Sequence, residues 1–390
     1  MRKFLRPLPA LLLLGFGALL IRYPQESATA AREGLAICTE VIIPSLFPFF
    51  VFSSLFISLG LSHSAGRVLG PLMAPLFRMR GTCAAPLLLG LVGGYPVGLR
   101  TAAMLREAGE CSWEEARRLS AFCNLCGPGF LLSVAGVGVF ASKEAGFFLL
   151  CTHWAAALLV GLIYRPRRNT EMSTKATPLP LPNHSASFSQ EFPNSVRDSF
   201  TSTLNVCAFV ILFTVLIRLM QTSGLLPMAA GFLSGLFPDI LSPALCQSLL
   251  IGIFELSTGV CSLSEVGATP LALPVASFIM GWGGLSVHCQ SLPFLDRLTD
   301  SRAPYFTGKL LHGLLAACLT AVLAPVLLPA GITPAPAFLE ATLLGSTPLL
   351  ALLHQELVAL WGLSGVIILF HRRKKVLVSG LPLQYNENRH

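Results

Sequence analysis

Charged residues are scarce in this sequence of 390 residues. Only 12% of the chain is Asp, Glu, Lys or Arg, whereas a soluble globular protein carries about 25%. Apolar residues make up 53% of the chain, and the mean hydropathy is +0.70. This composition leaves too little polar surface to cover one or two soluble domains. It excludes a cytosolic enzyme, a disordered chain and a nucleic-acid-binding module as the main interpretation, and it indicates a polytopic membrane protein.

Catalytic and nucleotide-binding motifs are also missing. The sequence has no GxxxxGK[ST] loop, nucleophile elbow, HExxH motif or paired-carboxylate motif. Most of the 11 cysteines lie inside apolar runs, where cysteine packs as a small hydrophobic residue. The CxxC-like spacing of Cys123 and Cys126 has no second CxxC and no histidine pair nearby, so helix packing beside a glycine-rich break is favoured over zinc or redox chemistry. We therefore expect no enzyme activity, no cofactor and no metal site.

The cations are spread over several short clusters, although the net charge is +8. Basic residues precede the first apolar run at 2–6, follow another at 165–168, and follow the last at 372–375. This distribution is typical of the cytoplasmic flanks of membrane spans, and it is favoured over a surface for an anionic partner. We expect the N-terminus, the 165–198 segment and the C-terminus to face the cytoplasm, with the lipid bilayer as the main partner and no nucleic acid.

The first half of the chain begins with two apolar runs. The run Leu8 to Ile21 follows a basic segment as in a signal peptide, but no clean cleavage site follows, so a retained short helix is favoured and cleavage stays an alternative. The run Leu35 to Leu61 contains Pro44 and Pro48, so we expect a kinked span. It should run from outside to inside, because the basic segment 67–80 follows it.

Three apolar segments then lie at about 83–104, 119–141 and 145–164. In the amphipathic stretch between the first two, Ser112 and Glu115 form the pattern of a capping box at a helix start. The chain must cross an even number of times between the two basic segments. At least one of the three segments should therefore be re-entrant or paired as a hairpin.

The second half repeats the first in sequence pattern after a polar, flexible linker at 165–198. Gly60-Leu61 matches Gly224-Leu225, which lies 164 residues further on. Gly98 matches Gly259, and Gly127-Pro128 matches Gly283-Gly284. Because the first long run of each half starts from a different side, the repeats should be inverted in the membrane, which is typical of transporters. A chance alignment of hydrophobic segments is the alternative.

The predicted fold is an all-α polytopic membrane protein with two inverted repeats and broken or re-entrant helices. Further spans are expected near 200–220, 243–265, 269–294, 308–329 and 348–370. The predicted organisation is an N-terminal helix and outer loop at 1–33, a first repeat at 34–164, the linker at 165–198, a second repeat at 199–330, and an outer loop, final helix and basic tail at 331–390.

The segment 90–98, GLVGGYPVG, is the first candidate for a binding site. Its density of glycine and proline does not suit a lipid-facing helix, and broken backbone is tolerated in a bilayer only where it is buried or lines a water-filled cavity. The freed N–H groups of a half-helix start attract anions. Arg100 could add a cation, or it could extend to the membrane interface. The candidate residues here are Gly93, Gly94, Tyr95, Pro96, Gly98 and Arg100.

Three further breaks are expected at 124–129, 254–259 and 281–284. Asn124 could contact a substrate or form a helix-to-helix hydrogen bond. Glu255, a carboxylate inside an apolar run, could carry a coupling proton or bind a cationic group; pairing with Arg218 is the structural alternative. The remaining candidates are Gly127, Pro128, Ser257, Thr258, Gly259, Gly283, Gly284, Ser286 and His288. His288 could titrate near neutral pH, whereas His153 is more typical of packing.

Because polar groups are costly in lipid, we expect the four breaks to converge near the midplane. Asn124, Glu255, Ser257, Thr258 and His288 should then face one shared cavity.

The blocks GLVGGYPVGLRTAAML and EEARRLSAFCNLCGPGFLLSVAGVGVF, with VIIPSLFPFF before them, resemble a known family. The chain is similar over most of residues 34–330 to the sporulation integral membrane protein YlbJ family of endospore-forming Firmicutes. FELSTG and GWGGLSVH are the best points of the weaker second half. That family carries the gate, or nucleoside-recognition, domain, which is shared distantly with concentrative nucleoside transporters and ferrous-iron transport proteins.

The resemblance implies a role in spore formation, through delivery of dipicolinate across the outer forespore membrane. Dipicolinate is a planar dianion, which helix N-termini and Arg100 would suit. The expected function is thus that of a transporter or facilitator of a small organic anion in a bacterial membrane. Whether the chain forms a homo-oligomer is left open. The alternatives are a nucleoside or metal-ion transporter with the same domain, and a non-transporting assembly factor of the spore envelope.

Overall fold

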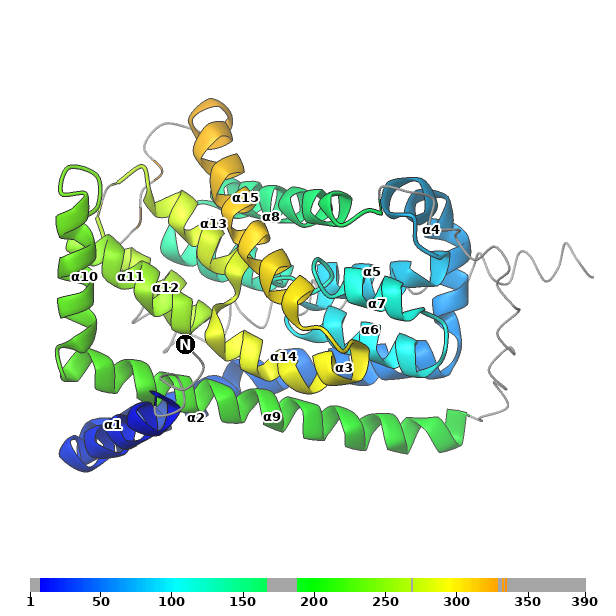
Figure 1. Cartoon of the computed structure of the whole chain (residues 1–390), viewed down its shortest axis with the longest axis horizontal. Helices are drawn as coiled ribbons and strands as arrows, with labels where there is room; N and C mark the ends of the chain where they lie inside the picture. Colours follow the sequence, from blue (N-terminus) through cyan, green and yellow to red (C-terminus); the bar gives the residue numbers. More distant parts are fainter. Residues whose placement is uncertain (1–7, 167–187, 268, 329–331, 333, 335–390) are drawn as a thin grey trace, which may run out of the picture.

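The computed structural model describes residues 8–166, 188–267, 269–328, 332 and 334, and these residues form helices without strands (Figure 1). The elements before the linker are α1 (Leu8–Arg22), α2 (Pro24–Ile37), the π-helix η1 (Cys38–Ile42), α3 (Ile43–Ser58), α4 (Leu61–Phe77), η2 (Gly81–Cys83), α5 (Ala84–Gly93), α6 (Val97–Glu107), α7 (Trp113–Leu119), the π-helix η3 (Phe130–Val139) and α8 (Lys143–Ile163). The elements after it are α9 (Phe188–Thr222), α10 (Leu225–Leu236), α11 (Pro243–Phe254), α12 (Leu256–Cys261), η4 (Ser262–Glu265), α13 (Ala272–Trp282), α14 (Gly284–Leu298) and α15 (Ala303–Leu327).

Among the described residues, four helical stretches are long and apolar enough to cross a membrane. They are Lys143–Ile163, Phe188–Thr222, Ala272–Leu298 and Ala303–Leu327. A fifth candidate joins α3 to α4, but the chain turns by 86° between them, so α4 does not continue the direction of α3. The all-α membrane fold predicted from the sequence is therefore confirmed. The predicted final helix near 348–370 and the basic tail lie outside the described residues.

One long helical path opens each half of the molecule. The path Pro24–Ser58 runs through α2, η1 and α3 without a break, and it packs along α9. In Figure 1, α9 extends along the lower edge of the molecule beside α2 and α3. The expected proline kink takes the form of the π-helix η1, which directly precedes α3 and its Pro44 and so adapts the backbone ahead of a residue that lacks an N–H.

A short helix follows each of these paths at opposite ends of the molecule. α4 follows α3, α10 follows α9, and both lie across the long axis in Figure 1. Gly60 (φ 71°) and Gly224 (φ 79°) are the N-caps of the two helices. Both need the left-handed backbone that glycine adopts without strain, which explains why the sequence pattern places glycine at both turns.

A helical hairpin comes next in each half. α5 and α6 pack together, and a Cβ at Gly98 would come within 2.9 Å of the Cα of Gly90. The tip of this hairpin is Gly94-Tyr95-Pro96. α11 and α12 pack together in the same way through Gly252 and Gly259, with Glu255 at the turn. The first hairpin matches the hairpin that the charge rule required between residues 80 and 165.

A broken pair of helices and one continuous helix complete each half. In the first half, α7 and η3 are separated by the non-helical segment 120–127, and α8 follows. In the second half, α13 and α14 are separated at Gly283, and α15 follows. The two halves thus have the same order of elements, and breaks occur at all four predicted places. The inversion of the repeats in the membrane stays a prediction.

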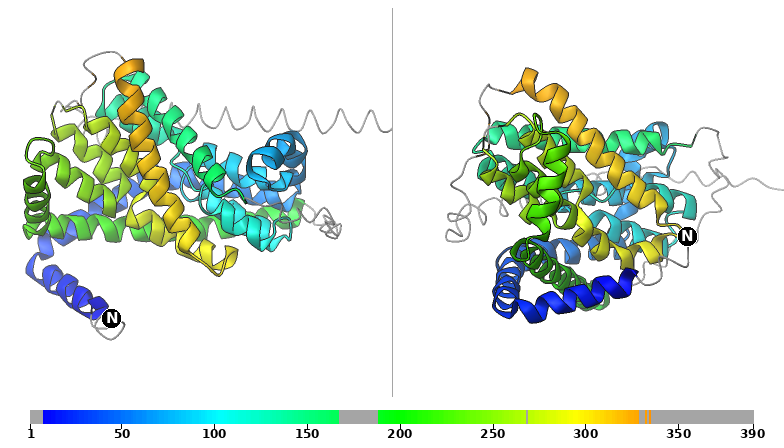
Figure 2. Two further views of the ribbon diagram at one scale, coloured as in Figure 1. Left: turned by 45° about the horizontal axis from the view of Figure 1, so that its top comes forward. Right: turned by 60° about the vertical axis from the view of Figure 1, so that its left-hand side comes forward.

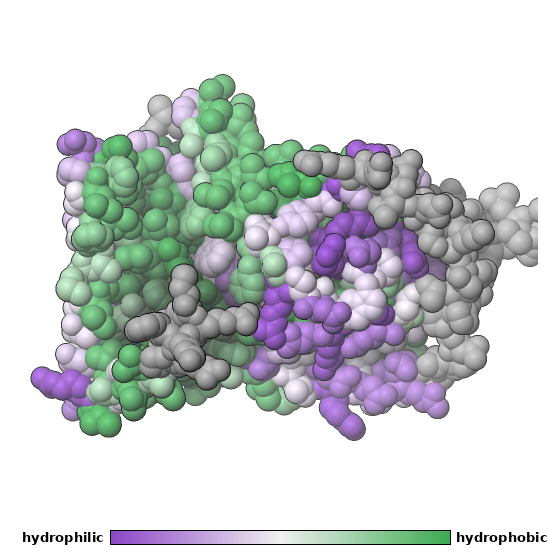
Figure 3. All heavy atoms as spheres, in the orientation of Figure 1, coloured by the Kyte–Doolittle hydropathy of each residue, from purple (hydrophilic) through white to green (hydrophobic). Residues whose placement is uncertain are grey.

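Polar and apolar surfaces separate along the long axis of the molecule. Figure 3 shows an apolar surface over α10, α11, α13 and α15, and a hydrophilic surface over α6, α7 and α14. At the hydrophilic end, Arg78 donates a hydrogen bond to the carbonyl of Pro166 (2.8 Å), and Arg297 pairs with Glu107 (3.7 Å). Two of the segments that the charge rule assigned to the cytoplasm therefore lie side by side.

Three boundaries differ from the sequence-based expectation. The expected outer loop after α1 is short, because α2 starts at Pro24, whose fixed φ suits the first turn of a helix. Residues 188–198 are helical and belong to α9, although they were assigned to the linker. The helices α4 and α10 were not predicted, because the basic segment 67–80 was assigned to a loop and α10 lies between two predicted spans.

Candidate functional site

The four helix breaks meet in the middle of the molecule. A Cβ at Gly94 would lie 2.9 Å from the backbone N of Gly127, so the first hairpin tip touches the second break. A Cβ at Gly283 would lie 3.3 Å from the Tyr95 ring, and one at Gly284 would lie 3.2 Å from the Cα of Glu255. The approach of Gly283 to Tyr95 joins the second half of the chain to the first. Figure 2 gives two further views of the helices that end there.

Tyr95 connects the tip of the first hairpin to the second half of the chain. Its hydroxyl donates to the carbonyl of Met280 at 2.8 Å, at the end of α13. The same hydroxyl accepts a hydrogen bond from the amine of Lys309, which also lies over the tyrosine ring, 4.5 Å from its centroid. One side chain at a helix break thus contacts two other elements.

Lys309 on α15 is completely buried at this position. Its amine donates a second hydrogen bond to the backbone carbonyl of Asn124 at 3.0 Å, inside the second break. No carboxylate of the described residues lies within ion-pair distance of it. The site therefore holds a buried amine whose partners are neutral, an arrangement that is costly for a charged group.

A hydroxyl and amide network surrounds Asn124. The Asn124 amide nitrogen donates to Ser291 Oγ (3.2 Å) and to the Tyr305 hydroxyl (3.4 Å), and Tyr305 donates to Ser291 (3.0 Å). His288 Nδ1 lies 3.0 Å from the Tyr305 hydroxyl. Among the described residues, the buried Asn124 Oδ1 and His288 Nε2 have no hydrogen-bond partner. The centre of the molecule therefore retains unused hydrogen-bonding groups.

Two buried histidines lie next to this network. His153 Nε2 accepts a hydrogen bond from the Cys126 N–H (3.0 Å), which belongs to the second break. His312 Nε2 lies 2.9 Å from the His153 carbonyl, and the two rings are 4.3 Å apart. Because His153 Nε2 is the acceptor, a neutral His153 carries its proton on Nδ1. Side chains thus satisfy backbone groups that the break releases, as a membrane interior requires.

Glu255 caps the start of α12. Its carboxylate accepts hydrogen bonds from the N–H groups of Ser257 (3.0 Å) and Thr258 (2.7 Å), and from the Thr258 hydroxyl (2.8 Å). The negative charge lies where the helix dipole is positive. The alternative partner, Arg218, instead pairs with Glu33 at 2.7 Å and Glu26 at 3.5 Å.

The predicted polar candidates therefore fall into two neighbouring groups. Asn124 and His288 share one network through Tyr305, whereas Glu255, Ser257 and Thr258 form the cap of α12. The approach of Gly284 to Glu255 brings the two groups next to each other. A shared cavity between them stays a prediction.

The remaining candidates have mainly packing contacts. A Cβ at Gly98 would collide with the Cys123 carbonyl, and one at Gly259 would collide with Gly252, so both glycines permit close hairpins. Gly93 faces the Val97 side chain, Pro96 is the N-cap of α6, and Pro128 follows the second break. The buried Ser286 accepts a hydrogen bond from Gln290 (3.0 Å).

Arg100 is buried but lies in a different place from the network. Its guanidinium donates to the Phe50 carbonyl (3.0 Å), to Ser53 Oγ (3.1 Å) and to Ser199 Oγ (3.4 Å). It also lies over the Phe50 ring, 4.9 Å from the centroid. Arg100 thus connects α6 to α3 and α9. Its contact with a cargo or with the membrane interface stays a prediction.

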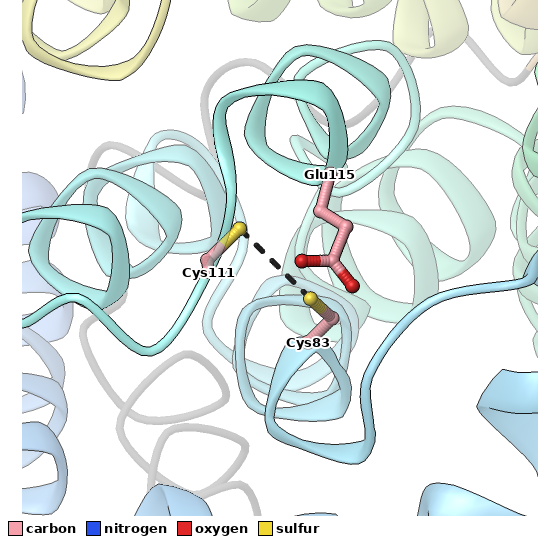
Figure 4. A group of neighbouring side chains, drawn as sticks. All are labelled: Cys83, Cys111 and Glu115. Atoms are coloured by element: carbon pink, nitrogen blue, oxygen red, sulfur yellow. Dashed lines mark hydrogen bonds between the residues drawn. The ribbon is translucent and has the colours of Figure 1, made fainter. Parts of the chain in front are cut away.

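A second cluster lies at the base of the first hairpin. Cys83, Cys111 and Glu115 point toward one another from η2 and the start of α7 (Figure 4), and the two sulfurs are 3.9 Å apart. Two thiols and a carboxylate could ligate a metal ion. However, the Glu115 oxygens already accept the Arg80 N–H (2.7 Å) and the Ser112 N–H (3.0 Å). The second bond completes the predicted capping box, which the structure confirms.

Sequence reasoning missed the most buried polar residues of the centre. Lys309, Tyr305 and Ser291 were not selected, and His153 was assigned to packing. One signal was present, because Lys309 and His312 lie three residues apart inside an apolar segment, and ionisable residues in such segments are functional candidates.

Comparison with known proteins agrees with this architecture. The model of the family described as "Gate: Nucleoside recognition" matches residues 40–167. The sporulation integral membrane protein YlbJ of Bacillus subtilis (strain 168) is 32% identical over 318 residues, an alignment that covers 77% of this chain and 78% of that protein. No solved structure matches.

Proposed function

Because the chain belongs to the family of the sporulation integral membrane protein YlbJ, we propose that it moves a small organic anion, dipicolinate, across the outer forespore membrane during sporulation. It acts as a transporter or facilitator and carries out no reaction on its cargo. Integral membrane character follows from the family and from the apolar helices. The cargo, the membrane and the mechanism are the parts that need an experiment.

The observation that carries the proposal is the meeting of four helix breaks around a buried polar network. A scaffold in a membrane has no need of helices broken at matching places in two halves, because each break releases backbone groups that must be satisfied at a cost. In secondary transporters, broken helices from two repeats form the cargo site near the midplane. The matching order of elements in the two halves supports the same arrangement here.

The orientation of the molecule follows from the same reasoning. The hydrophilic end, with Arg78, Arg297 and the end of α8, faces the cytoplasm, because basic residues are enriched on that side. The hairpins α5–α6 and α11–α12 then enter the membrane from opposite sides. Their tips meet at the centre, and movement of one half against the other opens the site to each side in turn.

The match to the nucleoside-recognition family supports a second candidate, transport of a nucleoside. A nucleoside is neutral and would gain nothing from a buried cation, whereas it could use Asn124 and His288 as hydrogen-bonding groups. Lys309 at the centre favours the anion, because a cation in low dielectric attracts a carboxylate strongly.

Reconstitution in liposomes separates the candidates. Purified protein is inserted into lipid vesicles, and the uptake of labelled dipicolinate, uridine and ferrous iron is measured against protein-free vesicles. We expect protein-dependent uptake of dipicolinate that unlabelled dipicolinate inhibits and uridine does not. Uptake of uridine or iron alone would replace the proposal with the second candidate or a metal transporter. No uptake of any of the three would favour an assembly factor.

A further inference from the structure

The buried amine of Lys309 has no counter-ion among the described residues. Its side chain is completely buried, and its amine donates to two neutral oxygens, the Tyr95 hydroxyl and the Asn124 carbonyl. A lysine amine can donate three hydrogen bonds. Neither of these oxygens compensates a positive charge, and no carboxylate of the described residues is paired with the amine. A buried cation without a counter-ion is among the most costly groups a protein can hold.

Satisfying the broken backbone does not by itself account for a lysine. The Asn124 carbonyl needs one donor, which a neutral amide or hydroxyl could supply. The centre already contains such groups in Ser291 and Tyr305. A lysine differs from these groups in that it can carry a positive charge, and a charge at this position has no counter-ion among the described residues.

The surroundings of Lys309 also contain unused polar atoms. Asn124 Oδ1 and His288 Nε2 are buried and have no partner among the described residues, and both residues bond to the Tyr305 hydroxyl. His153 Nδ1 and His312 Nδ1, next to the same centre, also lack one. An incoming ligand that carries a negative charge and hydrogen-bonding groups would supply the missing counter-ion of Lys309 and also bond to these unpartnered atoms.

We propose that Lys309 is the cargo-binding cation of the site, which forms an ion pair with a carboxylate of a small organic anion between the tips of the helix breaks. The inference rests on the proposed transport function and assigns the residue that recognises the cargo. Because Lys309 contacts the first hairpin tip and the second break together, and Tyr95 contacts the end of α13, the bound carboxylate connects both halves of the molecule.

Thermal unfolding of the purified protein in detergent tests this assignment without a transport assay. The midpoint is measured with increasing dipicolinate, and with pyridine-2,6-dicarboxamide as a neutral analogue of the same shape. The variants are Lys309→Met, which removes charge and donors, and Lys309→Gln, which keeps a donor. Lys143→Met, on the exposed start of α8, is the matched control.

We expect dipicolinate to stabilise the wild type and Lys143→Met, and the neutral analogue to have little effect. Both Lys309 variants should lose apparent dipicolinate affinity by about ten- to hundredfold, the effect of one charge-assisted contact. Without ligand, Lys309→Met leaves the Asn124 carbonyl without this donor, so its midpoint should lie below that of Lys309→Gln, which keeps a donor.

A purely structural lysine gives a different pattern. Lys309→Gln would then retain dipicolinate affinity, and that result overturns the assignment. A panel of other small carboxylates separates this inference from the proposed cargo. If another carboxylate stabilises the wild type but not Lys309→Gln, Lys309 is the cargo-binding cation and dipicolinate is not the cargo. If no carboxylate stabilises the wild type, the inference is overturned.

Discussion

At the scale of single residues, Glu255 illustrates how one carboxylate can support a helix break. It accepts two backbone N–H groups at the start of α12. Loss of a helix cap costs about 0.5–2 kcal/mol. We therefore expect Glu255→Ala to lower the free energy of unfolding by that amount, while Glu265→Ala, an exposed control, changes it little. Thermal unfolding in detergent measures both. Loss of the pH dependence of uptake in Glu255→Gln would show instead that Glu255 carries a coupling proton.

Arg100 gives a second prediction at this scale. The sequence suggested Arg100 as a cation of the binding site, but the guanidinium connects α6 to Phe50, Ser53 and Ser199. Its loss removes hydrogen bonds from a charged donor, each worth about 1.5–3 kcal/mol. We expect Arg100→Gln to lower the unfolding midpoint while the dipicolinate affinity of the folded protein stays unchanged. Arg302→Gln, whose partner Asp296 is exposed, is the control; a selective loss of affinity would return Arg100 to the site.

The sequence predicted part of the centre residue by residue. Asn124, His288 and Tyr95 were selected because each lies at or near a recognisable break. Lys309 and Tyr305 were not, because they lie on the continuous helix α15, and Ser291 was not, because it lies further from the break than His288 does; all three reach the centre through tertiary packing. Side-chain partners of this kind depend on how helices cross, and no spacing within one segment encodes that.

At the scale of elements, the glycine pairs of the two hairpins determine how closely the helices approach. A Cβ at Gly98 would collide with the Cys123 carbonyl and the backbone of Gly90. Because a backbone obstacle cannot rotate away, we expect Gly98→Ala to destabilise the protein by about 1–3 kcal/mol. Gly231→Ala in α10, where nothing lies within 4 Å, should be neutral or stabilising by up to about 1 kcal/mol. Equal unfolding midpoints for the two variants would contradict this close packing.

The breaks were predictable because glycine and proline act on the backbone of their own segment. All four were expected from GLVGGYPVG, CNLCGPG, FELSTG and GWGG, and the structure has a break at each. The transverse helices α4 and α10 were not expected, because the basic residues of 67–80 indicated a loop and no element was predicted between 220 and 243. Gly60 and Gly224, which start these helices in the left-handed conformation, were nevertheless aligned with each other from the sequence.

At the scale of the whole molecule, the two ends of a transporter of the proposed kind face opposite sides of the membrane. Asp239, after α10, and Asp300, after α14, are exposed near opposite ends. In a cysteine-free background, with the protein expressed in the cell membrane of non-sporulating cells, we expect Asp239→Cys to react with an impermeant maleimide added to intact cells. Asp300→Cys should react only after the membrane is permeabilised. The reverse pattern would invert the topology, and labelling of both from outside would contradict a membrane-spanning arrangement of the halves.

The central claim is that cargo binds where the four helix breaks meet. A structure determined with 4-bromopyridine-2,6-dicarboxylate tests it directly, because the anomalous signal of bromine locates the ligand independently of the protein. We predict a single bromine site between the Gly94–Pro96 tip, Gly283 and Glu255, with a carboxylate in contact with the Lys309 amine. A bromine site beside Arg100 or on the outer surface, with the centre unchanged, would contradict the account.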